Sequence, residues 1–184
     1  MVTEKLDGSN IGFFKLDGEL LISTRNNIIE LKEIEEVKQI LYKGMYQWLV
    51  DNGEHLKDNL HEGSGVFGEW IGMGKIKYPN LDKKVYIFAK ANINNKKEIY
   101  NLNYGHELFI YPFVKKEIPD YMGVVPVARP FLTFPTISDL NELYMCYTVK
   151  VDRSVEGFVV EYKNQVTKYV RMKNGSIEPH KENS

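Results

Sequence analysis

The amino-acid sequence predicts an α+β fold built mainly from antiparallel sheets flanked by a few helices. Two observations lead to this prediction. Segments rich in β-branched and aromatic residues recur along the chain and are bounded by Gly, Pro or Asn. Apolar side chains with the three- and four-residue spacing of an amphipathic helix appear in only two places.

The first expected strands, residues 11–14 and 19–23, are separated by an Asp17-Gly18 pair that favours a hairpin turn. Residues 65–71, 85–91, 157–162 and 167–172 predict further strands, the last two joined by a turn at Lys163-Asn164. Residues 92–103 are polar and predict a loop. Five prolines between residues 112 and 135 predict an irregular connector with short strands.

Residues 31–50 carry one apolar stripe and predict a helix that ends at Asn52-Gly53. A second, shorter helix is expected after Ser138, whose side chain is suited to cap it. The residues from Asn174 onward are polar and predict a frayed tail. We therefore expect one domain over residues 3–173, followed by a polar tail over residues 174–184.

Composition limits the class of protein. The chain has 184 residues, with 43% hydrophobic and 27% charged residues, which suits one globular domain. The sequence contains no apolar run of membrane-spanning length, so no membrane partner is expected. The single cysteine, Cys146, excludes an intrachain disulfide and favours a reducing, cytoplasmic location; we expect its side chain in the core.

The net charge of −1 gives no overall attraction to nucleic acid, so such binding would need a local basic patch. Lysines crowd the stretch between residues 75 and 97. They either form such a patch or an ordinary solvated face. The lysines of this stretch are Lys75, Lys77, Lys83, Lys84, Lys90, Lys96 and Lys97.

Lys5 is the first candidate for covalent chemistry. It stands in Glu4-Lys5-Leu6-Asp7-Gly8, and a turn centred on glycine lets backbone approach a ligand closely. An amine attacks only in its neutral form, which nearby cations and partial burial favour. By itself, the segment is more typical of an exposed lysine at the end of a strand.

Later segments supply groups that bind nucleotides. Arg25 follows the hairpin and is suited to phosphate or ribose oxygens. Glu69, in Phe67-Gly68-Glu69-Trp70, is suited to a sugar hydroxyl, and Phe88 to stacking on a purine. Glu156 comes directly before Gly157 at the start of a strand. In Tyr169-Val170-Arg171-Met172-Lys173, strand alternation would put the two cations on one face, which suits a phosphate.

In this order, these segments resemble the nucleotidyltransferase motifs of covalent ligases and capping enzymes. Glu4 to Asn10 is similar to the nucleophile motif, and the later segments are similar to the motifs that follow it. The separation of Phe67-Gly68-Glu69 from Tyr86-Ile87-Phe88 most resembles the RNA ligase 2 family. The resemblance extends from Glu4 to Lys173 and implies an ATP-grasp-like nucleotidyltransferase fold.

The resemblance also implies a role for each matching residue. Lys5 would attack the α-phosphate of ATP and keep AMP as a phosphoramidate. Glu69 would hold the ribose and Phe88 would stack on adenine. Glu156 would position Mg²⁺ or Mn²⁺, and Lys173 would neutralise charge on the α-phosphate. Arg171 would be catalytic together with Lys5 and Lys173. The remaining nucleotide-site residues would be Glu4, Asn10 and Arg25, with Asn10 helping the later sealing steps and Arg25 contacting the donor nucleotide.

The implied activity is ATP-dependent sealing of 5′-phosphate to 3′-hydroxyl RNA ends, possible substrates including nicked duplexes. Arg171 departs from the family, which commonly has lysine there. Little sequence follows Lys173, which leaves no room for the oligonucleotide-binding barrel expected in DNA ligases and capping enzymes. Two alternatives stay open: a non-catalytic nucleotide- or RNA-binding module derived from such a ligase, and a GTP-using capping-type enzyme.

Overall fold

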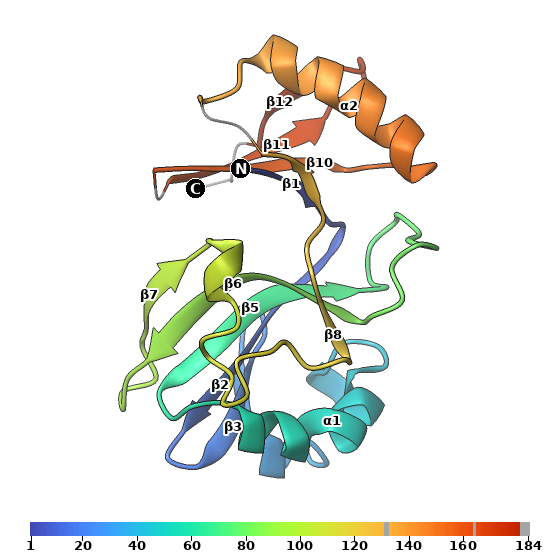
Figure 1. Cartoon of the computed structure of the whole chain (residues 1–184). Coiled ribbons are helices and arrows are strands. Elements are labelled where there is room, and N and C mark those ends of the chain that lie inside the picture. The colour runs from blue at the N-terminus through green and yellow to red at the C-terminus, as the bar shows by residue number, and fades with distance from the viewer. Residues whose placement is uncertain (131–132, 164, 181–184) are drawn as a thin grey trace. The chain divides into compact units, whose positions relative to one another are not determined.

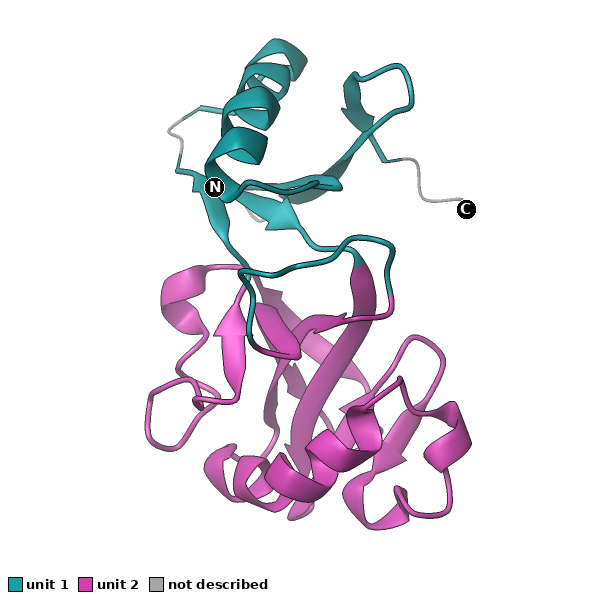
Figure 2. Cartoon of the chain, turned by 90° about the vertical axis from the view of Figure 1, so that its right-hand side faces the viewer, with its two compact units in different colours: residues 1–7, 74–82, 125–184 teal, residues 8–73, 83–124 magenta. Residues whose placement is uncertain are grey.

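The computed structural model describes residues 1–130, 133–163 and 165–180 (Figure 1). The chain divides into two compact units, coloured separately in Figure 2. Unit 1 comprises Met1–Asp7, Gly74–Asp82 and Val125–Ser184, and unit 2 comprises Gly8–Met73 and Lys83–Val124. Neither unit is a continuous stretch of sequence. Antiparallel pairing predominates in both, so the predicted α+β class is confirmed.

Unit 1 is a sheet with strand order β12-β11-β10-β1-β9. One face is covered by helix α2 (Ile137–Val151), as Figure 1 shows. Side chains from α2 and the sheet form its core, which includes Val2, Leu140, Tyr147, Phe158, Tyr169 and Ile177. The strands are β1 (Val2–Lys5), β9 (Val127–Arg129), β10 (Gly157–Tyr162), β11 (Gln165–Arg171) and β12 (Ile177–Pro179).

Helix α2 begins earlier and runs further than the sequence predicted. The predicted cap, Ser138, is wrong, because Thr136 is the N-cap residue. The Thr136 hydroxyl accepts from the Asp139 amide at 3.1 Å, and the Asp139 carboxylate accepts from the Thr136 amide at 2.7 Å, which completes a capping box. The core position expected for Cys146 is also wrong: this residue is exposed on α2.

The C-terminal residues are more ordered than a frayed tail. Strand β12 pairs antiparallel with β11, with Arg171 opposite Ile177, and the Ile177 side chain is fully buried. Ile177 is a single apolar residue in a polar segment, so the sequence shows no periodic pattern there that would predict a strand. The strands on either side of the predicted Lys163-Asn164 turn are confirmed, although Asn164 itself lies outside the described residues.

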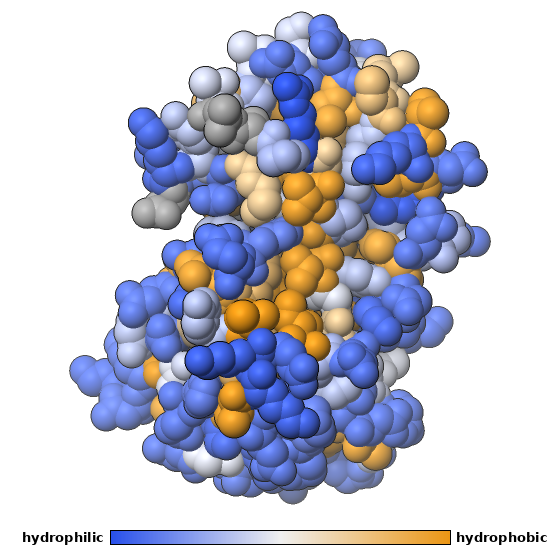
Figure 3. Space-filling view, in the orientation of Figure 1, coloured by the Kyte–Doolittle hydropathy of each residue, from blue (hydrophilic) through white to orange (hydrophobic). Residues whose placement is uncertain are grey.

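Unit 2 is a sheet with strand order β4-β3-β2-β5-β6-β7, in which β8 also pairs parallel with β6. Phe13 and Trp70 from the sheet and Trp48 from helix α1 (Met45–Asn59) share its main core. Hydrophilic residues predominate over α1, β2 and β3 on the face seen in Figure 3. The strands are β2 (Gly8–Leu16), β3 (Glu19–Ser23), β4 (Ile28–Glu30), β5 (Ser64–Ile71), β6 (Val85–Ile93), β7 (Ile99–Asn103) and β8 (Met122–Val124).

The helix predicted over residues 31–50 is largely wrong. Short 3₁₀ turns, Leu31–Glu33 and Lys38–Ile40, precede α1, which runs through Asn52-Gly53 to Asn59. Gly53 does not end the helix, because its role is close packing: a Cβ there would lie 2.6 Å from the Leu31 Cδ1 atom. The Asn52 side chain donates to the Trp48 carbonyl at 3.0 Å, which is compatible with a helical backbone.

The polar segment 92–103 is also different from its prediction. Strand β6 continues to Ile93, and β7 pairs with it, with Ile93 opposite Ile99. These two apolar residues lie at the ends of a polar stretch, so the alternation typical of a strand was hidden. The expected connector with short strands between residues 112 and 135 is confirmed by β8 and β9.

None of the helices that the structure describes has both the length and the apolarity needed to cross a bilayer.

The burial of Ile177 yields a test of the folded tail. Replacing Ile177 with alanine should lower the free energy of unfolding by about 2–5 kcal/mol, because the substitution leaves a cavity in the core of unit 1. The exposed neighbour Glu178 is the matched control, and Glu178→Ala should change the free energy of unfolding by less than about 0.5 kcal/mol. Chemical denaturation measures both. Equal, small effects of the two substitutions would show that the tail contributes nothing to stability.

Candidate active site

Strand pairing brings the predicted nucleophile to a predicted metal ligand. Lys5, the last residue of β1, is paired with Gly157 of β10, so Glu156 lies beside it. The Lys5 Nζ is 2.7 Å from the Glu156 Oε2, and the two side chains are 19% and 30% exposed. Both groups are thus ordered by contact with each other and still reachable by a ligand.

The two faces of the sheet of unit 1 have different surroundings. Successive strand residues point to opposite faces. Val2 belongs to the core beneath α2, and the Glu4 carboxylate accepts a hydrogen bond from Tyr147 of that helix at 2.8 Å. Lys5 therefore points to the face that α2 does not cover.

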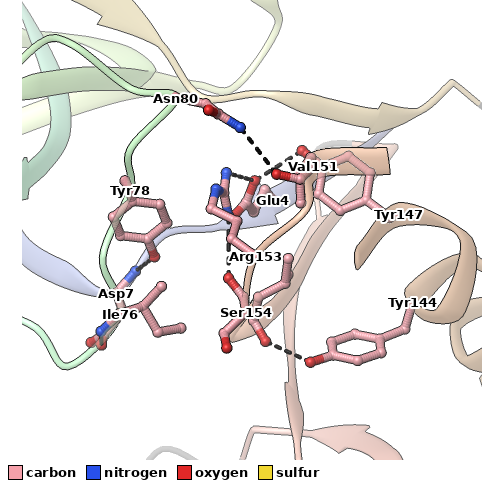
Figure 4. A network of polar contacts seen from close by, with 11 residues as sticks. Glu4, Asp7, Ile76, Tyr78, Asn80, Tyr144, Tyr147, Val151, Arg153 and Ser154 are labelled. Carbon is pink, nitrogen blue, oxygen red and sulfur yellow. Dashed lines mark hydrogen bonds and ion pairs between the residues drawn. The ribbon is translucent and has the colours of Figure 1, made fainter. Parts of the chain in front are cut away.

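Glu4, a predicted nucleotide-binding residue, has its carboxylate engaged inside unit 1 (Figure 4). Arg153 donates from Nη2 to Glu4 Oε2 at 2.8 Å and from Nη1 to Oε1, and Tyr147 also donates to Oε2. The Glu4 and Arg153 side chains are 0% and 6% exposed. A bond from this carboxylate to a nucleotide would have to replace one of these contacts, so direct binding by Glu4 stays a prediction.

The environment of this ion pair shifts the pKa of its neighbours. Burial raises the pKa of the Tyr147 hydroxyl well above its usual value, and the charge of Glu4 adds to the shift. Burial likewise raises the pKa of Tyr78, whose ring lies 4.7 Å from the Arg153 guanidinium. Burial alone would lower the pKa of Arg153, but the hydrogen bond to Glu4 and the charges of Glu4 and the neighbouring tyrosines together outweigh it and leave that pKa raised.

The two late cations do not share one strand face. Tyr169 is in the core beneath α2, and Arg171, two residues on, packs its guanidinium 4.5 Å from the Tyr144 ring. Strand β11 ends at Arg171, so the predicted alternation does not extend to Lys173, which lies in an exposed turn. Neither cation has an ion pair with another described residue, but the Arg171 guanidinium is packed on Tyr144 whereas the Lys173 ammonium is exposed.

Unit 2 holds the remaining predicted residues. Asn10 of β2 is paired with Glu69 of β5, so both side chains lie on the same face of that sheet. The Tyr42 hydroxyl donates to the Asn10 carbonyl at 2.9 Å and accepts from the Arg25 amide at 3.2 Å. Tyr42 thereby links the segments of Asn10 and Arg25.

Phe88 stands at an irregularity in the same sheet. The β5–β6 register shifts so that Phe67 faces Ala89 and Gly68 faces Ile87, which leaves Phe88 as the extra residue of a bulge. Bulges re-aim side chains and are common beside active sites. The Phe88 ring is stacked on Tyr104, with centroids 6.3 Å apart and planes 12° from parallel. The predicted purine platform is therefore a partly buried aromatic pair.

In unit 1, a divalent ion could be held by one carboxylate, that of Glu156. Among residues 1–130, 133–163 and 165–180, no three His, Cys, Asp or Glu side chains gather as a metal site. Glu156 uses Oε2 for Lys5, and its Oε1 has no hydrogen bond to another described residue. One carboxylate oxygen beside substrate phosphates and water is a usual arrangement for Mg²⁺.

Several residues that build these sites gave no signal in the sequence. Tyr42 falls in a segment expected to be helical, and Tyr104 follows one expected to be a loop. Tyr78, Tyr147 and Arg153 lie outside the motifs, although Arg153 is only three residues before Glu156. Their partners are far away in sequence, so only tertiary structure reveals them.

The lysine-rich stretch between residues 75 and 97 is divided between the two units. Lys75 and Lys77 belong to unit 1, and the other lysines of the stretch belong to unit 2.

Comparison with known protein families adds independent information. A family model described as RNA ligase matches residues 1–174 of the chain. The matched part includes every predicted site residue from Glu4 to Lys173 and all strands except β12. A search of curated proteins finds no match.

The buried tyrosines predict how stability changes in alkali. Their raised pKa values favour the neutral phenol in the folded state, whereas unfolded tyrosines ionise near pH 10. The resulting stabilisation of the folded state is complete below about pH 10. It is lost as the pH rises toward the folded-state pKa values, at about 1.4 kcal/mol for each pH unit and each tyrosine. Chemical denaturation from pH 8 upward should show this fall, and Tyr147→Phe should make it shallower. If the free energy of unfolding fell equally steeply with pH in the wild type and in Tyr147→Phe, the raised pKa of Tyr147 would be contradicted.

Proposed function

Because the chain belongs to the RNA ligase family, we propose that it is an ATP-dependent RNA ligase in which Lys5 takes up AMP covalently. The fold would then be of the ATP-grasp-like nucleotidyltransferase type. The observation that carries the proposal is the pair formed by Lys5 Nζ and Glu156 Oε2 at 2.7 Å. A lysine ordered by a carboxylate on the open face of a sheet is a suitable nucleophile, provided that it loses its proton.

In the first step, the neutral Lys5 amine attacks the α-phosphorus of ATP. An N–P bond forms, the bond to the pyrophosphate oxygen breaks, and pyrophosphate leaves. Glu156 Oε2 is within hydrogen-bonding reach to accept the proton that Lys5 loses. The product is a phosphoramidate that joins AMP to Lys5.

Charge neutralisation at the phosphates falls to Lys173 and to a divalent ion. The exposed Lys173 is suited to the α-phosphate, since its ammonium has no competing ion pair with a described residue. Mg²⁺ or Mn²⁺, held by Glu156 and the substrate phosphates, would neutralise further charge when bound. Arg171 has a packing role on Tyr144, which leaves Lys173 as the principal cation of this motif.

The residues of unit 2 would recognise the nucleoside. Phe88, backed by Tyr104, would stack on adenine, and Glu69 would accept from a ribose hydroxyl. Arg25 would contact the donor nucleotide.

In the later steps the 5′-phosphate of an RNA end displaces Lys5 from AMP. The 3′-hydroxyl of the other end then attacks that 5′-phosphate, expelling AMP and forming the phosphodiester; Asn10 would assist here.

Formation of the lysyl-AMP adduct is the first test. Protein incubated with a divalent metal and ATP labelled at the α-phosphate should retain label after denaturation. Lys5→Ala and Lys5→Arg should both lose it, because a guanidinium keeps the charge without acting as a nucleophile. Lys97→Ala, at an exposed ion pair with Glu30, is the control and should be labelled normally.

The outcome of this experiment separates the alternatives. Absence of label on folded wild-type protein would contradict the proposal, and ATP binding without pyrophosphate release would then identify a non-catalytic binding module. Label that GTP supplies better than ATP would identify a capping-type enzyme.

Stacking on Phe88 is the second test. Phe88→Ala should weaken ATP binding by about 1–3 kcal/mol, the usual contribution of one stacked base. Isothermal titration with Lys5→Ala protein, which cannot turn ATP over, measures this affinity. Tyr100→Ala, on β7 and 48% exposed, is the matched control. Equal affinities for the Phe88 and Tyr100 variants would remove Phe88 from the nucleotide site.

A further inference from the structure

A buried network joins the segment of the predicted nucleophile to the end of helix α2. Arg153 binds both oxygens of the Glu4 carboxylate, and Tyr147 donates to one of them. A two-bond contact between a guanidinium and a carboxylate fixes relative orientation as well as distance. We call Glu4, Tyr147, Arg153 and Tyr78 the clasp; Figure 4 shows them together.

Tyr78 fastens a third segment, Gly74–Asp82, to the other two. Its ring lies 4.7 Å from the Arg153 guanidinium, and its hydroxyl accepts from the Asp7 amide at 2.6 Å. Asn80 donates to the Val151 carbonyl at the end of α2 at 3.0 Å. The segment is thus tied to both the end of β1 and the end of α2 (Figure 4).

The Asp7 carboxylate strengthens the same connection. It accepts from the amides of Lys75 at 2.6 Å and Ile76 at 3.0 Å. The backbones approach so closely that a Cβ on Gly74 would lie 2.3 Å from the Asp7 carbonyl oxygen. Asp7 and Gly74 therefore hold the segment against the residues that follow Lys5.

The clasp lies directly beside the two reactive groups without being part of them. Glu4 immediately precedes Lys5, and Arg153 stands three residues before Glu156, in the turn between α2 and β10. Because Glu4 and Lys5 point to opposite faces of β1, fixing Glu4 on the covered face also fixes the direction of Lys5 on the open face. The same Arg153 contact holds the turn that presents Glu156.

Stability alone gives no reason for an ion pair at this position. Burying both charges carries a large desolvation cost, and well-packed apolar residues are often as stable or more so. In addition, Arg153 Nε is buried and has no hydrogen-bond partner. What an ion pair provides better than apolar packing is a fixed orientation.

We propose that Arg153 is a positioning residue, which acts through Glu4 to aim the Lys5 amine and the Glu156 carboxylate for attack on the α-phosphate. This inference rests on the proposed function of Lys5. It assigns the clasp an effect on the rate of adduct formation at saturating ATP.

The test removes both buried charges at once, since truncating one would leave the other unpaired. In Glu4→Gln/Arg153→Met, single-turnover formation of the labelled adduct should slow by about 10²-fold, the effect of misplacing a reacting group by about 1 Å. The rate is measured at saturating ATP, because Glu4 is also a predicted nucleotide-binding residue, and the melting temperature should stay close to that of the wild type. The matched control is Glu54→Gln/Lys57→Met, which removes a surface ion pair of unit 2 and should leave the rate unchanged.

Two further measurements keep the result interpretable if the double variant folds poorly. Tyr78→Phe removes only the hydroxyl bound to the Asp7 amide and should slow adduct formation by a smaller factor. In the absence of ATP, reductive methylation followed by peptide mapping should show Lys5 reacting faster in both clasp variants than in the wild type, relative to Lys57.

The outcomes are distinct. A wild type that forms no adduct would overturn the proposed function, and the inference with it. A wild type that forms the adduct while both clasp variants match its rate would overturn the inference alone. The inference would also be overturned if adduct formation in the clasp variants slowed only in proportion to a smaller folded fraction while Lys5 was methylated at its wild-type rate.

Discussion

The antiparallel pairing of β1 with β10 is the constraint on which the site in unit 1 depends. It joins residues about 150 positions apart in sequence and puts Lys5 opposite Gly157. Side chains alternate along a strand, so a slip of one residue would turn the Lys5 amine toward α2 and bring Glu4 to the open face. The register is held by Val2 in the core and by the two bonds from Arg153 to Glu4. The Lys5–Glu156 contact follows from that register.

The same sheet separates packed side chains from those proposed to take part in chemistry. On the covered face, Tyr144 and Tyr147 of α2 pack on Phe158, and Tyr144 also meets Arg171. The open face keeps Lys5, whose contact with Glu156 leaves one carboxylate oxygen available. A family motif can therefore contain residues of both kinds. Arg171 illustrates this, because its sequence position suggests phosphate binding and its stacking on Tyr144 indicates packing.

Elements with a local sequence pattern could be predicted from the sequence. The hairpin at Asp17-Gly18 and the strands around Glu69 and Phe88 have period-two patterns and clear ends, and the structure confirms them. Prediction from the sequence failed where tertiary contacts decide: Gly53 looked like a helix terminus but packs against Leu31, and Ile177 looked like part of a polar tail but fills a core. The motif residues could be named from order and spacing. Arg153 and Tyr78 could not, since their roles arise from contacts with Glu4 and Asp7.

The most direct measurement is a single-turnover transfer from isolated AMP-protein. Protein charged with labelled AMP and freed of ATP would be mixed with nicked duplex RNA that carries a 5′-phosphate at the nick. We predict that label leaves Lys5, passes through an AMP-capped RNA 5′ end, and is released as AMP while the nick is sealed. An adduct that cannot be isolated, or one that persists or hydrolyses with the nick unsealed, would contradict it.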